Sequence, residues 1–131
     1  MQVEKSERWP DLRLAANALE KGSGEGVKVA IIDSGVDLSH PALSGLTLLD
    51  DVAISCDGAN IRIEDRSGDD LYGHGTAVTS LLLKESPGVQ VGSFRALDSR
   101  NHARNFVIAE CVKQAIAVSY THLTLPTSPK V

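Results

Sequence analysis

The stretch "VKVAIID", residues 27–33, constrains the fold more than any other part of the chain. It is a short apolar run rich in valine and isoleucine, it lies between Gly26 and Gly35, and it leads into "DSG". A continuous apolar run of this kind is typical of a strand buried on both faces, as in parallel sheets covered by helices. We therefore expect residues 27–33 to form an interior strand of a parallel sheet.

Three segments predict helices. Residues 12–21, "LRLAANALEK", are rich in helix formers and are followed by the helix-breaking "GSGEG". A second helix follows Gly75 and stops before Pro87, and we expect its apolar residues to share one buried face: Ala77, Val78, Leu81 and Leu82. A third helix, with Asn105 as the expected cap, has apolar residues at helical spacing: Val107, Ile108, Cys111, Val112, Ala115 and Ile116.

The order of these segments predicts the fold class. "VQVGSFRAL", residues 89–97, is a second strand candidate, whereas residues 38–71 predict a loop with one short strand near 46–52 or 61–63. A helix, strand, loop, helix, strand, helix order indicates an α/β fold that is incomplete: half of a doubly wound parallel sheet flanked by helices. Half a sheet leaves apolar faces and one edge uncovered.

Composition excludes several classes of protein. The chain has 131 residues, 42% of them hydrophobic, and 17 acidic residues against 13 basic ones. This is enough for one modest domain, and without a basic cluster nucleic acid is not an expected partner. No apolar run approaches the roughly 18 residues of a membrane span, and the N-terminus does not resemble a secretory signal. Cys56 and Cys111 are expected to be free thiols, which together with the missing signal predicts a cytoplasmic location.

Asp33 is the first candidate functional residue. It stands at the expected carboxyl end of the first strand, where ligands and catalytic groups collect in open α/β sheets. An aspartate in this place can serve catalysis, grip phosphate, bind a metal or only cap a turn. The motif "DSG" alone leaves these alternatives open.

His74 is the second candidate. Gly73 and Gly75 on either side permit close approach of neighbouring backbone, which suits a side chain that projects into a cleft. A position at the start of a helix favours the neutral imidazole, the form that a general base requires. The alternative is a histidine that caps the helix or fills a packing gap.

Asp33 and His74 together predict more than either alone. An acid that ends one strand and a histidine that opens the next helix can meet at one sheet edge. The carboxylate would then hold one ring nitrogen and leave the other free to take a proton from a nucleophile.

The segments "VKVAIIDSGVDLSHPAL" and "GHGTAVTSLL" resemble the catalytic Asp and His segments of the subtilisin-like serine proteases, and the likeness extends over about residues 15–116. The resemblance implies a serine endopeptidase that acts on peptides or proteins without a cofactor, with Asp33 as orienting acid and His74 as general base. It also implies supporting roles for Ser34, Gly35, Gly73, Gly75 and Thr76, and a structural role for His40 and Pro41. Calcium is common in the intact relatives, but no ligand set here can be matched to a site, and the oligomeric state stays open.

The chain departs from this family in one respect. The family's nucleophile lies in a "GTSMAAP"-like segment, and the asparagine of its oxyanion hole precedes it; neither is present. Ser80, Ser93 and Ser99 do not have the setting of an activated nucleophile. We therefore expect this chain to be inactive as a protease.

The last residues suggest why the serine is missing. Residues 118–127, "VSYTHLTLPT", resemble one translated frame of a transposase adapter used in sequencing libraries. One leftover adapter base and an eight-base index make three codons, which would be Ser128, Pro129 and Lys130, and a constant segment that begins with a valine codon and a stop would give Val131. We therefore expect residues 1–117 to be a partial peptidase domain with only the Asp and His segments, and residues 118–131 to be a non-native tail.

Two alternatives remain. If the tail is native, the chain is a short non-catalytic relative that acts as a binding or regulatory module. A phosphate-handling α/β domain would use "IIDSGVD" as its loop but leaves "GHGT" unexplained.

Overall fold

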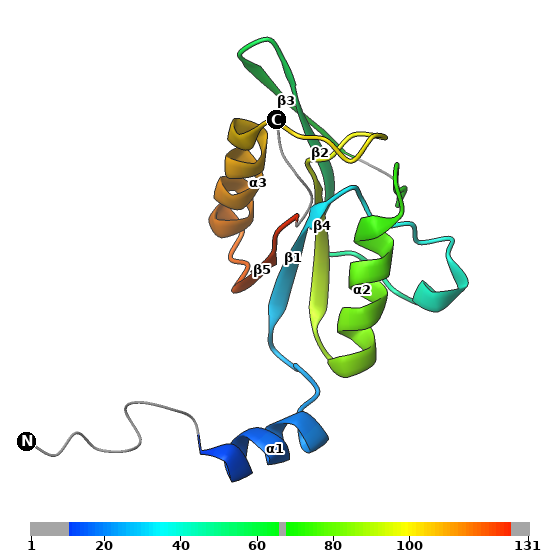
Figure 1. Cartoon of the computed structure of the whole chain (residues 1–131), viewed down its shortest axis with the longest axis vertical. Coiled ribbons are helices and arrows are strands. Elements are labelled where there is room, and N and C mark those ends of the chain that lie inside the picture. The colour runs from blue at the N-terminus through cyan, green and yellow to red at the C-terminus, as the bar shows by residue number, and fades with distance from the viewer. Residues whose placement is uncertain (1–10, 66–67, 127–131) are drawn as a thin grey trace, which may run out of the picture.

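A computed structural model of the chain describes residues 11–65 and 68–126. Its elements, in chain order (Figure 1), are α1 (Leu12–Lys21), β1 (Lys28–Asp33), the 3-10 turn η2 (Pro41–Leu43), β2 (Asp51–Asp57), β3 (Asn60–Asp65), α2 (His74–Glu85), β4 (Gln90–Arg95), α3 (Asn105–Ala117) and β5 (His122–Thr124). The strands form one mixed sheet in the order β3-β2-β4-β1-β5. This is an incomplete α/β domain, as the sequence predicted.

The central strands are parallel. β1 pairs along its whole length with β4, from Lys28 beside Gln90 to Asp33 beside Arg95, and β4 pairs in parallel with β2. Among the strands of the described residues, only β3 is antiparallel, and it lies at one edge. The carboxyl ends of β1, β2 and β4 therefore meet at the same edge of the sheet.

The two faces of the sheet bury separate cores because the side chains of β1 alternate. Ala30 and Ile32 face the core formed with α3, which also contains Phe94, Val107 and Cys111. Val29 and Ile31 face the other core, which Leu82 and Leu83 of α2 partly cover. Helices on both faces explain why residues 27–33 are apolar without alternation.

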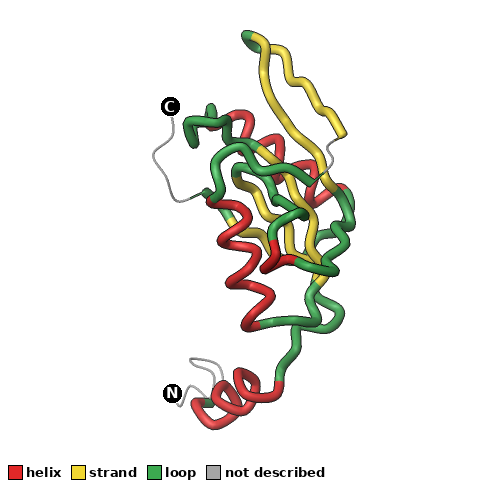
Figure 2. Tube along the Cα trace, turned by 90° about the vertical axis from the view of Figure 1, so that its right-hand side faces the viewer, coloured by secondary structure: helices red, strands yellow, loops and turns green. Residues whose placement is uncertain are grey.

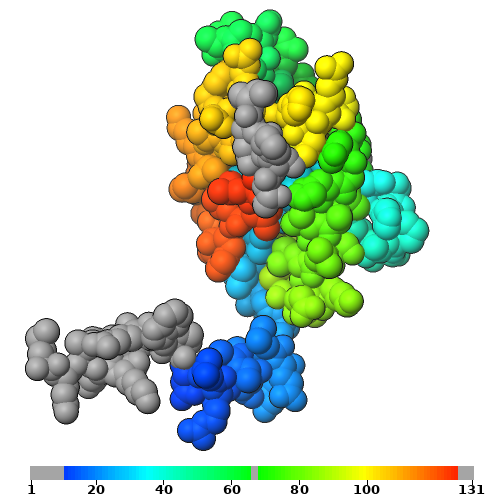
Figure 3. All heavy atoms as spheres, viewed as in Figure 1, coloured from blue at the N-terminus to red at the C-terminus, as the bar shows by residue number. Residues whose placement is uncertain are grey.

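Helix α1 lies apart from the sheet, joined to β1 by residues 22–27 (Figure 3). Asp11 caps it by accepting a hydrogen bond from the Arg13 amide. The helix predicted for residues 12–21 is confirmed, but it buries none of its residues, and Leu12 and Leu19 are 83% and 82% exposed. Within the described residues, no helix has the length and apolar character needed to cross a membrane.

Within the loop predicted for residues 38–71, the short strand expected near 61–63 is confirmed as part of β3, but the structure has a second strand there, β2. β2 and β3 form a hairpin that projects beyond the rest of the sheet (Figures 1 and 2). Gly58 at the tip has φ +62°, as the first central residue of a two-residue hairpin turn requires. β3 is exposed on every residue, although Ile61 and Ile63 alternate with polar residues along it.

Two details of the predicted helices are also wrong. In α2 the buried residues are Gly75, Thr76 and Thr79, whereas Leu81 of the expected buried face is 65% exposed. The first turn of α2 packs tightly on the end of β1 through small residues, and this contact decides which face turns inward. Helix α3 begins at Asn105 with Arg104 in the cap position, so Asn105 does not cap it.

The described part of the C-terminal tail packs on the sheet. β5 adds three residues in parallel to β1, from His122 beside Val29 to Thr124 beside Ile31. Tyr120 stacks edge-on against Phe94 at 5.2 Å and donates a hydrogen bond to Asp50 at 2.7 Å. The non-native origin of residues 118–131 stays a prediction, and residues 127–131 lie outside the described part.

Candidate active site

Asp33 is the last residue of β1 and is buried, with its side chain only 2% exposed. Its Oδ1 accepts a hydrogen bond of 2.8 Å from the Ser34 amide. The backbone of Asp33 is fixed as well, since its carbonyl accepts from the amides of Ala96 and Leu97 after β4. One carboxylate oxygen is thus held by the turn after the strand, and the other is directed to a partner.

That partner is His74, the first residue of α2. Its Nδ1 lies 2.8 Å from Asp33 Oδ2, although the two residues are 41 positions apart. An ionised carboxylate can only accept, so this contact favours the neutral tautomer with the proton on Nδ1. The His74 side chain is 34% exposed, so a buried acid faces a ring that solvent and substrate can reach.

Glycines on both segments allow this contact, and the backbone shows how. Gly73 precedes α2 with φ +107°, a conformation that side chains rarely adopt. A Cβ built on Gly75 would overlap the Gly35 carbonyl oxygen, and one built on Gly35 would overlap that of Asp69. Gly73 thus permits the positive φ before the helix, whereas Gly35 and Gly75 permit close backbone contacts that leave no room for a side chain.

The other supporting residues join the same network. Ser34 Oγ accepts from the Gly75 amide at 3.1 Å, and Thr76 Oγ1 accepts from the Asp37 amide at 2.9 Å. His40 Nδ1 accepts from the Ala42 amide and so caps the 3-10 turn that follows, a structural arrangement. The resemblance had implied support from Ser34 and Thr76, and the hydrogen bonds give each a defined partner.

One residue of the network was not identified from the sequence. Asp70 accepts hydrogen bonds from Ser34, Tyr72, Gly73 and Thr76. In the sequence it lay in the charged stretch "RIEDRSGDD", which predicted only a loop. The available signal was an aspartate two and three residues before Tyr72 and Gly73, the spacing of a turn in which the side chain accepts backbone amides.

Ser80, Ser93 and Ser99, the serines weighed in the sequence, lie in settings unlike that of an activated nucleophile. Ser93 is fully buried inside β4, where no substrate can reach it. Ser80 lies on the second turn of α2, and Ser99 is exposed in the loop after β4. Within the described residues, no hydrogen bond joins Ser80 or Ser99 to His74.

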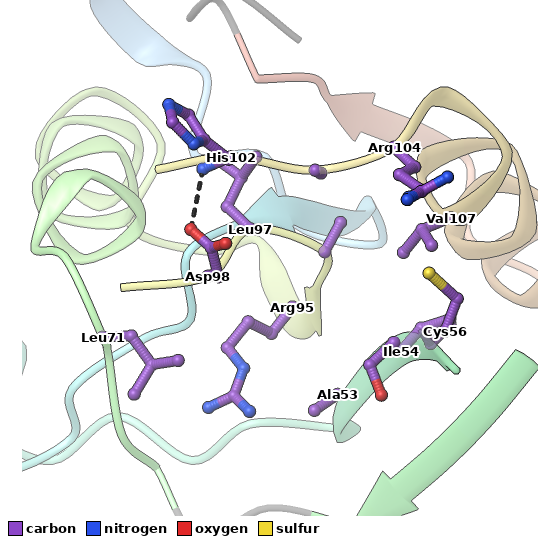
Figure 4. A pocket seen from close by; sticks show the side chains of 13 residues that line it. Ala53, Ile54, Cys56, Leu71, Arg95, Leu97, Asp98, His102, Arg104 and Val107 are labelled. Atoms are coloured by element: carbon purple, nitrogen blue, oxygen red, sulfur yellow. Dashed lines mark hydrogen bonds between the residues drawn. The ribbon is translucent and has the colours of Figure 1, made fainter. Parts of the chain in front are cut away.

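Two cavities adjoin at the segment before α2, because Leu71 lines both. One, of about 400 Å³, lies beyond the ends of β2 and β4, where Arg95 and Leu71 point into it (Figure 4). The other, of about 650 Å³, lies between Asp37 and the exposed side of α2. Neither cavity has Asp33 or His74 in its lining, so the cavities adjoin the segments near the pair and not the pair itself.

The residues described offer no metal centre. Among residues 11–65 and 68–126 there is no group of three His, Cys, Asp or Glu side chains placed to hold an ion. Cys111 is buried and Cys56 half-buried, and both are free thiols. Whether calcium binds the intact protein stays a prediction.

Comparison with known proteins points to a single family. A profile described as the Subtilase family, peptidase S8, matches residues 24–120. The chain is 29% identical over 90 residues to "Subtilisin-like protease 2" of Trichophyton rubrum, covering 66% of this chain and 19% of that protein. It is 27% identical over 101 residues to a subtilisin-like protease of Coccidioides posadasii (strain C735), covering 74% of this chain and 23% of that protein. The chain thus spans about a fifth of the length of these relatives.

Proposed function

Because the chain belongs to the subtilase family, we propose that the intact protein is a serine endopeptidase in which Asp33 and His74 are two members of the catalytic triad. The contact of 2.8 Å between Asp33 Oδ2 and His74 Nδ1 carries this proposal. A buried acid at the end of a strand and a half-exposed histidine at the start of a helix form the acid–base part of a triad. The same contact counts against a phosphate-binding loop, because phosphate binding does not require a contact between an aspartate and a histidine.

The pair supports a defined sequence of proton transfers. Asp33 holds Nδ1–H, so Nε2 carries the free lone pair and can remove the proton from a serine hydroxyl as it attacks a peptide carbonyl. The resulting imidazolium is stabilised by the Asp33 carboxylate and returns its proton to the leaving amine. Peptides or proteins are the substrates, and none of these steps requires a cofactor.

The proposal includes the inactivity of this chain. The nucleophile and the oxyanion-hole asparagine are proposed to lie in a part of the protein that follows the His segment. Loss of a triad member removes several orders of magnitude of rate, so the pair alone has no appreciable peptidase activity. A cytoplasmic location stays a prediction from the sequence.

A longer reading frame from the same source tests this proposal. We expect that frame to encode a serine that a fluorophosphonate probe labels, and we expect His74→Ala to abolish the labelling. The 131-residue chain should remain unlabelled and should not cleave peptides. A longer frame without a reactive serine would contradict the proposal, and so would peptide cleavage by the present chain that His74→Ala abolishes.

A further inference from the structure

The carboxylate of Asp70 accepts five hydrogen bonds. Its Oδ1 accepts from Ser34 Oγ at 2.7 Å and from the amides of Tyr72 and Gly73 at 3.0 and 2.8 Å. Its Oδ2 accepts from the Thr76 amide at 3.0 Å and from Thr76 Oγ1. An ionised carboxylate has about four lone-pair directions, so both oxygens are fully occupied and the group cannot rotate without losing partners.

The donors lie on both sides of the Asp33–His74 contact. Ser34 directly follows Asp33, whereas Gly73 directly precedes His74 and Thr76 lies in the same first helical turn. The backbone of Asp70 reinforces this arrangement, since it forms an isolated antiparallel bridge with Gly35. Asp70 therefore ties the segment that carries the acid to the segment that carries the histidine.

Electrostatics favour the ionised form of Asp70. Burial by itself would raise its pKa, but hydrogen bonds from Thr76, Gly73, Tyr72 and Ser34 together lower the pKa below the ordinary carboxyl value. The carboxylate also lies at the amino end of α2, where the helix dipole stabilises a negative charge. The group is thus charged at neutral pH, when its hydrogen bonds are strongest.

We propose that Asp70 is a positioning residue, which fixes the first turn of α2 against the turn after β1 and thereby keeps the His74 ring aligned with Asp33. The proposal rests on the proposed role of His74 as general base. Asp70 touches neither the ring nor a substrate. It acts through the backbone of Gly73, through Thr76 and through Ser34.

Asp69 provides a matched control. It is the preceding residue and carries the same charge, but its carboxylate faces Arg95 at 3.5 Å and its side chain is 46% exposed. Asp69→Asn and Asp70→Asn therefore remove the same charge from adjacent positions. Only Asp70→Asn places an amide group opposite donors of the first turn of α2, because one carboxylate oxygen becomes NH₂.

The readout is which ring nitrogen of His74 carries the proton in the 131-residue chain. It is measured by ¹⁵N NMR at about pH 9, where imidazoles are neutral. His74→Gln identifies the resonance. We expect the Nδ1–H tautomer to dominate in the natural sequence and in Asp69→Asn, and to fall to about half in Asp70→Asn. We also expect exchange of the Thr76 amide to accelerate at least about tenfold, as loss of a hydrogen bond to a charged group implies.

A second pair covers the case in which Asp70→Asn does not fold. Thr76→Val removes the hydroxyl that donates to Asp70, whereas Thr76→Ser keeps it. We expect Thr76→Val to lower the fraction of the Nδ1–H tautomer of His74 to about half. We expect Thr76→Ser to keep the fraction found in the natural sequence.

A folded Asp70→Asn with an unchanged His74 tautomer would overturn the proposal, and so would equal effects of Asp69→Asn or of the two Thr76 variants. None of these readouts needs peptidase activity. A protein without a reactive serine would refute the proposed function and leave this result intact.

Discussion

At the scale of the residue, Gly75 is the tightest steric constraint on the Asp33–His74 contact, because a Cβ there would overlap the backbone of Gly35. The Gly35 carbonyl belongs to the backbone, so it cannot move aside as the end of a flexible side chain would. We expect Gly75→Ala to destabilise the fold by about 2–3 kcal/mol, near the upper end for overpacking. Urea unfolding followed by circular dichroism measures this.

Gly45→Ala is the control for Gly75→Ala. Gly45 has φ +84° but no atom within 4 Å of an added Cβ, so alanine there should cost only about 1 kcal/mol of backbone strain. Equal effects of the two variants would show that space at Gly75 is not the constraint.

Burial of the Cys111 thiol predicts a loss of stability in alkali. Desolvation, and secondarily the charge of Glu110, raises its pKa from 9.0 to about 12. The unfolded chain releases this proton above about pH 9 while the folded chain retains it, so the free energy of unfolding should decrease between about pH 9 and 12. Burial is also the largest cause of a raised pKa at Tyr120, and the hydrogen bond of Tyr120 to Asp50 raises that pKa further.

Urea titrations across this pH range measure the effect of Cys111. Cys111→Ala should lower stability at neutral pH through the lost packing, but its stability should decline less steeply with pH. Parallel curves for the two proteins would refute the assignment to Cys111.

The residue scale also shows where sequence reasoning was sufficient and where it was not. Asp33 and His74 could be selected from local patterns, because Asp33 ends an apolar run two residues before Gly35 and His74 opens a helix between two glycines. Asp70 was not selected: its spacing to Tyr72 and Gly73 indicated only a local turn, whereas its further donors, Ser34 and Thr76, lie 36 residues before and 6 residues after it. Its charged surroundings gave no sign that it is partly buried.

At the scale of the element, the β2–β3 hairpin shows that a strand can form even though its side chains are exposed. Ile54 and Ile63 face each other across the two strands, yet Ile54 is 2% exposed and Ile63 is 48% exposed. Ile54 belongs to the core formed with α3. β3 is held by its backbone ladder. The sequence predicted one short strand in this region, near 46–52 or 61–63, and not two strands that pair, so the hairpin was missed. β1 was predicted because both of its faces are buried.

This cross-strand pair gives a matched test. Ile54→Ala should destabilise the domain by about 2–4 kcal/mol, because it leaves a cavity in the core. Ile63→Ala should cost less than about 1 kcal/mol, in the range of surface and cross-strand contacts. Chemical denaturation of both variants measures the difference, and similar values would mean that the hairpin does not pack as described.

At the scale of the whole molecule, the C-terminal tail is expected to be foreign, yet it occupies an edge of the sheet. Tyr120 fills the space over Gly92, where an added Cβ would overlap its ring, and β5 covers the free edge of β1. We expect the chain without residues 118–131 to be less stable and to aggregate more readily, because Phe94 and that edge become exposed. Thermal unfolding and light scattering of the two chain lengths test this, and unchanged behaviour would show that the tail contributes nothing.

The origin of the tail is tested on the source DNA. We expect the codons of residues 118–131 to read as adapter and index, and an independent clone to diverge after residue 117 into a frame with an oxyanion-hole asparagine and a "GTS"-type serine. A clone from native DNA that repeats the same 14 codons would refute this and favour the non-catalytic relative.

The short separation of Asp33 and His74, 41 residues, also matters during synthesis. Both segments leave the ribosome before any nucleophile segment that follows them is translated. A domain generally folds as a unit, and synthesis adds about 5–20 residues per second. Under the proposed function, the acid and the base are thus synthesised before the nucleophile, and the nascent chain can gain proteolytic capability only after the serine segment has been translated.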